Sequence, residues 1–115
     1  MDLADYKPKG KLCNKHLLTL LDYSSNEIYE ILAQALKFKD MQRRGKKHTY
    51  LKGKTLAMIF AKSSTRTRVS FEQGIRQLGG TPLFLSSNDI QLGRGETIHD
   101  TVKVLSRYNI DGSMI

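Results

Sequence analysis

Cysteine and tryptophan are almost missing from this sequence, which has one cysteine, Cys13, and no tryptophan. A single cysteine excludes an internal disulfide and a zinc site built from several cysteines, and it fits a reducing compartment. The three histidines, His16, His48 and His99, are far apart and show no metal-ligand spacing. We therefore expect neither a metal ion nor another cofactor.

Long apolar runs are also absent. No stretch approaches the roughly 20 residues that span a bilayer. Residues 1–5 do not begin the basic-then-apolar pattern of a secretory signal. With 115 residues, 39% hydrophobic and 26% charged, the chain has the size and composition of one soluble globular domain. We expect a cytoplasmic protein that does not bind membranes.

Acidic residues are in short supply, with 11 Asp and Glu against 19 Lys and Arg, a net charge of +8. Such a charge suits an anionic partner, whether nucleic acid, anionic lipid or a phosphorylated metabolite. The densest cluster, residues 43–48, could form a nucleic-acid patch or a localisation signal. Cations followed by a glycine are also typical of a helix C-terminus, and we prefer that interpretation. A basic nucleic-acid-binding module remains the alternative function.

The preceding residues predict a long helix. Ser24 and Glu27 have the spacing of a capping box, and apolar residues recur at helical intervals from Ile28 to Phe38. The helix should end near Arg44. An earlier apolar run, residues 17–21, is too short to decide between a short helix and an entry segment.

Strands and helices then alternate. Residues 54–61 are apolar without alternation, as in a strand buried on both faces of a parallel sheet. Phe71, Ile75 and Leu78 predict a helix closed by Gly79-Gly80, and a second strand spans residues 81–85 with Pro82 at its start, where a missing N–H is tolerated.

A further helix follows, capped by Thr97 with Asp100 and carrying apolar residues at 98, 102 and 105. After the turn at Asp111-Gly112, residues 113–115 resemble the opening of a third strand. The order predicts an α/β fold: a parallel sheet with helices on both faces, a βαβαβ core preceded by a long N-terminal helix. Because the chain stops inside a strand, we expect this domain to be incomplete at its C-terminus.

A polar segment joins the first strand to the helix after it. In open α/β sheets ligands bind at this edge, beyond the carboxyl ends of the strands. Helix N–H groups, several hydroxyls and bidentate guanidinium groups together suit a phosphate. The hydroxyls are Ser63, Ser64, Thr65 and Thr67, and the guanidinium groups are Arg66 and Arg68. Capping alone needs only one or two hydroxyls, so we favour an anion site. Walker A and G-x-G-x-x-G patterns are absent.

Two motifs carry a family resemblance. Residues 60–72, with Ser64-Thr65-Arg66-Thr67 at their centre, resemble the carbamoyl-phosphate signature of the aspartate/ornithine carbamoyltransferase family. Residues 83–98, including Gln91-Leu92-Gly93-Arg94-Gly95, resemble its ornithine branch in particular. The resemblance is dense over residues 50–115 and looser before them. It implies that residues 1–115 are the N-terminal part of a carbamoyl-phosphate-binding domain, with the rest of that domain and the ornithine-binding domain absent.

The resemblance also assigns roles. It implies that the phosphate is held by Ser64, Thr65, Arg66 and Thr67, with Arg66 and Thr67 catalytic and Thr67 near the carbamoyl oxygen. Gln91 would reach the carbamoyl phosphate site of a neighbouring subunit in a trimer, whereas the residues alone suggest a solvated loop position. Arg94 and Glu96 are weaker candidates, and Arg68 is expected to support the loop rather than contact the ligand.

The implied reaction is attack by the neutral δ-amine of ornithine on carbamoyl phosphate, giving citrulline and phosphate in arginine metabolism. It requires no metal and no covalent intermediate. Other acceptor amines, such as aspartate, putrescine or an acylated ornithine, remain open because the selecting residues would lie in the absent domain. Residues expected after position 115 are needed for turnover, so we expect the fragment alone to be inactive.

Overall fold

The computed structural model describes residues 3, 6–7, 9, 11–12, 16–60, 62, 64–86, 97–108 and 110–114. The chain forms two compact units, Met1–Lys47 and His48–Ile115. Within the described ranges no helix is both long and apolar enough to cross a membrane.

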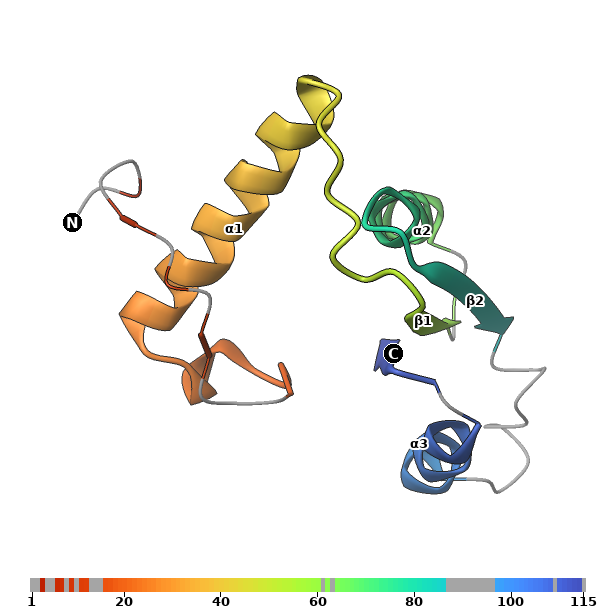
Figure 1. Cartoon of the computed structure of the whole chain (residues 1–115). Coiled ribbons are helices and arrows are strands. Elements are labelled where there is room, and N and C mark those ends of the chain that lie inside the picture. The colour runs from red at the N-terminus through yellow and green to blue at the C-terminus, as the bar shows by residue number, and fades with distance from the viewer. Residues whose placement is uncertain are drawn as a thin grey trace. The chain divides into compact units, whose positions relative to one another are not determined.

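The first unit is built around one long helix, α1 (Ser25–Arg43), directly preceded by a short 3-10 turn, η2 (Leu20–Asp22) (Figure 1). The predicted capping box is present. The Ser24 hydroxyl accepts from the Glu27 backbone N–H at 3.2 Å, and the Ser24 N–H donates to the Glu27 carboxylate at 3.0 Å. Two otherwise unpaired donors are thereby satisfied at the helix start. The turn η2 overlaps the apolar run of residues 17–21, so this run contains part of a short helical turn.

The end of α1 explains the first part of the basic cluster. Gly45 has a φ of 69°, a left-handed conformation that glycine adopts at little cost. Its N–H donates to Gln42 at 3.1 Å, and the N–H of Lys46 donates to Met41 at 2.9 Å. This pair of hydrogen bonds is the Schellman arrangement that terminates helices. The prediction of a helix C-terminus here is confirmed.

Two arginines of the cluster pair with one carboxylate of the same helix. Asp40 accepts from Arg43 at 2.8 Å and lies 3.2 Å from Arg44. The hydrogen bond from Arg43 is the main reason that the pKa of Asp40 falls below its ordinary value. Because both arginines are exposed, these ion pairs add little to the stability of the fold. They do show that two positive charges of the cluster have a partner within their own helix.

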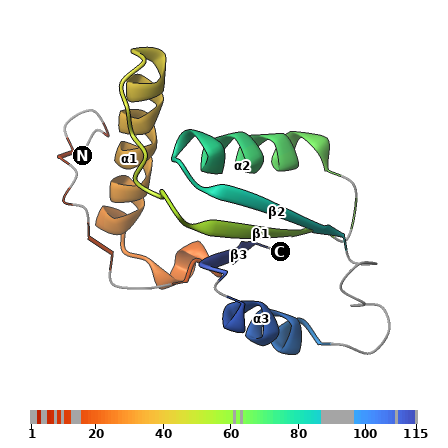
Figure 2. The same cartoon turned by 45° about the vertical axis from the view of Figure 1, so that its right-hand side comes forward.

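The second unit is a three-stranded parallel sheet with the order β2-β1-β3. Its strands are β1 (Thr55–Phe60), β2 (Thr81–Ser86) and β3 (Gly112–Met114). The helices α2 (Thr65–Gln77) and α3 (Ile98–Arg107) cover opposite faces of the sheet (Figure 2). The α/β fold predicted from the sequence is confirmed.

The core of this unit is the middle strand. Ala57, Met58 and Ile59 are 0–1% exposed, which confirms that the non-alternating apolar run lies between two covered faces. Phe60 pairs with Ser86, so β1 and β2 end side by side. At the opposite end, Asp111 accepts from the Thr55 N–H at 2.8 Å and positions the start of β3.

The helix α2 ends as the glycine pair predicts. The N–H of Gly79 donates to Arg76 at 3.0 Å, and the N–H of Gly80 donates to Ile75 at 2.8 Å. Of the three apolar residues that predicted this helix, Ile75 is buried, whereas Phe71 is 44% exposed. Phe71 lines an open apolar groove beside Ile75 instead of entering the core.

The last helix, α3, begins at the predicted cap, where the Thr97 hydroxyl accepts from the Asp100 N–H at 3.0 Å. Val102 and Leu105 are half-buried. The most buried described side chain of α3 is Thr101, at 4% exposure, a position that the apolar spacing did not indicate.

The turn after α2 supplies a stability prediction. Gly79 has a φ of 87°, and a Cβ there would lie 2.9 Å from the Cβ of Thr49. Gly79→Ala should lower the free energy of unfolding by about 2 kcal/mol or more, since left-handed strain of roughly 1–2 kcal/mol is joined by a clash. Gly45→Ala is the matched control, because Gly45 has a similar φ but nothing within 4 Å. Urea denaturation of both variants measures the difference, and equal losses would contradict a steric role for Thr49.

Candidate functional site

The candidate phosphate motif begins just after β1 and continues into α2: Ser64 is the N-cap of α2, and Thr65, Arg66 and Thr67 form its first turn. Parallel pairing puts the carboxyl ends of β1 and β2 at one edge of the sheet, with Phe60 beside Ser86. Ser86, the last residue of β2, therefore lies beside the strand end that leads into the candidate phosphate motif. Ligands of open α/β sheets bind at this edge.

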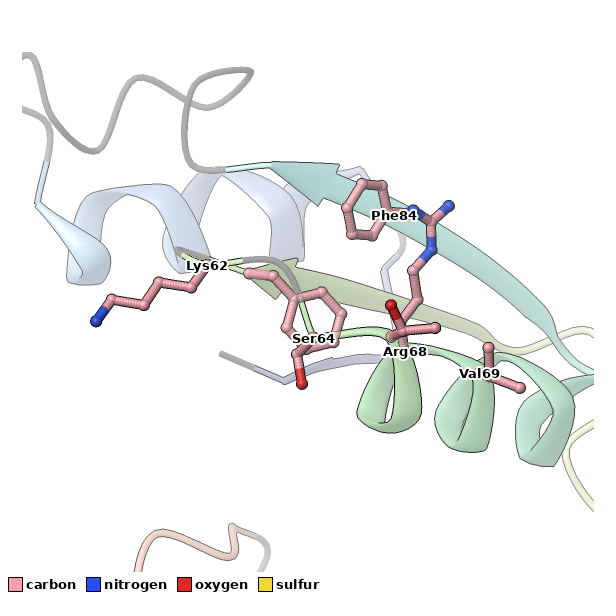
Figure 3. A pocket seen from close by; sticks show the side chains of 7 residues that line it. Lys62, Ser64, Arg68, Val69 and Phe84 are labelled. Atoms are coloured by element: carbon pink, nitrogen blue, oxygen red, sulfur yellow. The ribbon is translucent and has the colours of Figure 1, made fainter.

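A cavity of about 300 Å³ opens at this edge. Its lining comes from the end of β1, the first turns of α2 and β2 (Figure 3): Phe60, Lys62, Ser64, Thr65, Arg68, Val69 and Phe84. Two aromatic rings, Phe60 and Phe84, lie 5.8 Å apart with a tilt of 31°. Cations and hydroxyls are thus grouped around an aromatic pair.

The N-terminus of α2 differs from those of the other two helices. Ser24 and Thr97 cap α1 and α3 through their side chains, but Ser64, at the N-cap of α2, makes no side-chain cap hydrogen bond. The first turn of α2 also contains no acidic residue. The Ser64 hydroxyl is not used for capping, which weighs against the purely structural explanation of the motif. A positive helix end with unpaired N–H groups remains at the cavity.

The four motif residues are not all on one face. Thr65 lines the cavity together with Arg68 and Val69, three and four residues later, as helical periodicity requires. Arg66 and Thr67 are rotated away by the 100° per residue of a helix and are not part of the lining. Arg66 is exposed and has no hydrogen bond or ion pair with any described residue, while Thr67 is half-buried.

Arg68 is held by protein groups. Its Cζ lies 3.6 Å from the centre of the Phe84 ring, and its Nε lies 3.7 Å from a carboxylate oxygen of Glu72. Figure 3 shows the guanidinium beside Phe84. These contacts agree with the expectation that Arg68 supports the loop.

Lys62 is a lining residue that the sequence reasoning did not single out. Its side chain extends away from the Arg68 end of the cavity (Figure 3). The position of Lys62 directly before the Ser/Thr run is the sequence feature that indicates a place at the site. Phe60 and Phe84 lie within the two family motifs, residues 60–72 and 83–98, but the sequence predicts no role at the site for either ring.

Gln91, Arg94 and Glu96 lie outside the described residues, as do Ser63 and Cys13. The role of Gln91 therefore stays a prediction. Among the residues that are described, no three His, Cys, Asp or Glu side chains are grouped so that they could hold a metal ion.

Comparison with known proteins bears on this site. Residues 15–115 match the family described as aspartate/ornithine carbamoyltransferase, carbamoyl-P binding domain. The chain is 64% identical over 101 residues to an ornithine carbamoyltransferase of Campylobacter hominis, covering 88% of this chain and 33% of that relative.

Two solved structures have the same fold. Ornithine carbamoyltransferase from Pyrococcus furiosus superposes with a TM-score of 0.78 at 58% identity, over 85% of this chain and 31% of that one. The catalytic subunit of M. jannaschii aspartate transcarbamoylase gives a TM-score of 0.72 at 36% identity, over 84% of this chain and 32% of that one. The chain spans about a third of the length of the relatives it matches. Because the family match covers nearly all of its residues, this chain belongs to the aspartate/ornithine carbamoyltransferase family and lies within its carbamoyl-phosphate-binding domain.

Proposed function

We propose that this chain is the carbamoyl-phosphate-binding part of an ornithine carbamoyltransferase. The observation that carries the proposal is the N-terminus of α2, whose Ser64 side chain makes no capping bond and which opens on a cavity lined by hydroxyls and Lys62. We take carbamoyl phosphate as the ligand of this anion site because the chain matches the carbamoyl-phosphate-binding domain of its family. On this proposal the whole enzyme transfers the carbamoyl group to the δ-amine of ornithine and releases citrulline and phosphate.

The phosphate is held by three kinds of donor. Backbone N–H groups of the first turn of α2 point beyond the helix end, and the hydroxyls of Ser64 and Thr65 line the cavity. Arg66, which pairs with no described residue, is available to grip two phosphate oxygens. Thr67 follows on the same turn and is assigned to the carbamoyl oxygen.

Carbamoyl transfer needs positioning and charge stabilisation from these residues. The nitrogen lone pair of the neutral amine attacks the carbonyl carbon, and the carbon–oxygen bond to the phosphate then breaks. The phosphate leaves with the bonding electrons and accepts the proton that the amine loses. Donors aimed at the carbonyl oxygen and at the phosphate stabilise the charge that develops there, and fixed orientation lowers the entropic part of the barrier.

Ornithine is favoured as the acceptor by the similarity. The curated relatives at 54–64% identity are ornithine carbamoyltransferases, whereas the aspartate transcarbamoylase neighbours are 36% identical. Putrescine and acylated ornithine stay as alternatives, because residues outside this chain would select between them. Placement in cytoplasmic arginine metabolism follows from the same proposal.

Gln91 is proposed to complete the site. The connection that carries it begins after Ser86, which pairs with Phe60, the last residue of β1, so the two connections start from neighbouring strand ends. Whether Gln91 serves its own subunit or a neighbour in a trimer rests on the family resemblance alone.

Activity can be tested by grafting. This chain would replace the matching third of the P. furiosus ornithine carbamoyltransferase and, separately, of the M. jannaschii aspartate transcarbamoylase. We expect the first chimera to form citrulline from carbamoyl phosphate and ornithine. The second should carbamoylate aspartate at a rate at least about tenfold lower than the rate of the first chimera with ornithine. The reason is that, in the second chimera, residues 83–98 of the ornithine type meet a partner domain of the aspartate type.

Colorimetric assay of the carbamoylated product measures both rates, and each unmodified host serves as the control. A folded first chimera that binds ornithine but forms no citrulline would contradict the proposed function. Equal rates in both chimeras would contradict the assignment to the ornithine branch.

A further inference from the structure

We infer that Arg68 is a positioning residue that fixes the phosphate-binding end of α2 against β2 without contacting the ligand itself. The inference rests on the proposed function for the identity of the ligand. Its structural part, the attachment of the first turn of α2 to β2, can be tested without any ligand.

Two contacts join the elements around the cavity. The Arg68 guanidinium lies over Phe84 at 3.6 Å, and Phe84 packs against Phe60 with ring centres 5.8 Å apart. Phe60 is the last residue of β1, and two residues separate it from the Ser/Thr/Arg run of residues 63–68. Side chains from α2, β2 and β1 therefore form one continuous stack along the cavity.

The backbone closes this arrangement. The N–H of Arg68 donates to the carbonyl of Ser64 at 2.9 Å, the first hydrogen bond of the helix. Arg68 is thus bonded through its main chain to Ser64 and through its side chain to β2. A displacement of Arg68 along the sheet would move Ser64 and the N–H groups of the first turn with it.

The surroundings of Arg68 do not suit a phosphate ligand. One face of the guanidinium is covered by the Phe84 ring, and Glu72 lies 3.7 Å from Nε. A carboxylate at this distance offsets the positive charge that an anion would seek. Arg66, two residues earlier, is exposed and has no such partner among the described residues. The two arginines of the motif therefore have different tasks, binding for Arg66 and placement for Arg68.

Arg76 provides a matched control. It pairs with the same carboxylate, at 3.5 Å from Glu72, and lies on the same helix. Arg68→Gln and Arg76→Gln each remove one positive charge and one Glu72 contact, but only Arg68→Gln removes the contact with Phe84. Phe84→Leu removes the ring and keeps the arginine.

The experiment compares these variants in the 115-residue chain by calorimetric titration with carbamoyl phosphate and by backbone amide spectra without ligand. We expect Arg68→Gln and Phe84→Leu to weaken binding about tenfold, the scale of a lost cation–π contact, and to shift the amide signals of residues 64–67. Arg76→Gln should change affinity less than twofold and leave those signals in place. Arg68→Lys, which restores a cation over the ring, should recover part of the affinity.

Different results would contradict the positioning role of Arg68 and the proposed function. If Arg68→Gln behaves like Arg76→Gln, Arg68 has no positioning role. If Arg68→Gln costs as much affinity as Arg66→Ala while Phe84→Leu costs nothing, Arg68 is a direct ligand and the inference is wrong. If the unmodified chain binds no carbamoyl phosphate, the proposed function fails, and the ligand-free amide spectra still decide the inference. Should Arg68→Gln not fold, Phe84→Leu makes the same comparison with Arg76→Gln.

Discussion

Replacing Arg66 with alanine should abolish most of the affinity for carbamoyl phosphate. The guanidinium is exposed in the free chain and has no described partner, so its charge-assisted hydrogen bonds are available to the phosphate. Loss of such a pair typically costs about 2 kcal/mol or more, which is roughly a thirtyfold loss of affinity. Isothermal titration of the 115-residue chain with carbamoyl phosphate measures it directly.

The control for this experiment is a variant with more charge removed elsewhere. Arg43, Arg44, Lys46 and Lys47 changed together to Gln should leave carbamoyl phosphate affinity within about twofold, because exposed charges that do not contact the ligand are screened by salt. If this variant loses as much affinity as Arg66→Ala, net charge and not the motif drives binding. Tight duplex binding that this variant abolishes would instead support the nucleic-acid alternative.

Met58→Ala should be the most destabilising single truncation in the second unit. Met58 is 0% exposed at the centre of β1, with strands on both sides. Truncation of a buried methionine to alanine costs roughly 2–5 kcal/mol, because lost burial is joined by a cavity that the neighbours fill incompletely. Chemical denaturation followed by circular dichroism measures the change.

Val104→Ala supplies the comparison for Met58, since Val104 is 48% exposed on α3. Its truncation should cost less than about 0.5 kcal/mol, as exposed substitutions usually do. If Met58→Ala costs less than about 1 kcal/mol, β1 is not the centre of the core.

Local signals made most of the fold predictable. The capping box at Ser24, the glycine pair after α2 and the cap at Thr97 each depend on residues within a few positions of one another. The non-alternating apolar run of β1 indicates burial on both faces, whichever segments cover those faces. The order of strands in the sheet is different, because it depends on which segments meet across the chain, and alternation of strands and helices predicts only that the sheet is parallel.

The chemistry of the site was predictable, but its arrangement was not. The density of hydroxyls and arginines in residues 63–68 indicates an anion site whatever the rotation of α2. Which of them line the cavity depends on how α2 sits on the sheet, and this places Thr65 and Arg68 inside the lining and leaves Arg66 outside it.

The contact of Arg68 with Phe84 also depends on the register of the sheet. Phe84 pairs with Met58, two residues before Phe60, so the two rings lie on the same face of neighbouring strands. A shift of one residue would turn Phe84 to the other face and leave Arg68 without the ring. No local pattern in the sequence fixes that register.

The N-terminus of α2 should bind carbamoyl phosphate, and amide-resolved titration of the ¹⁵N-labelled chain tests this binding most directly. Carbamoyl phosphate should produce saturable shifts concentrated at residues 64–68, with weaker shifts from inorganic phosphate at the same amides and none from ornithine alone. Shifts centred instead on residues 43–48, or no saturable shift at residues 64–68, would contradict the account.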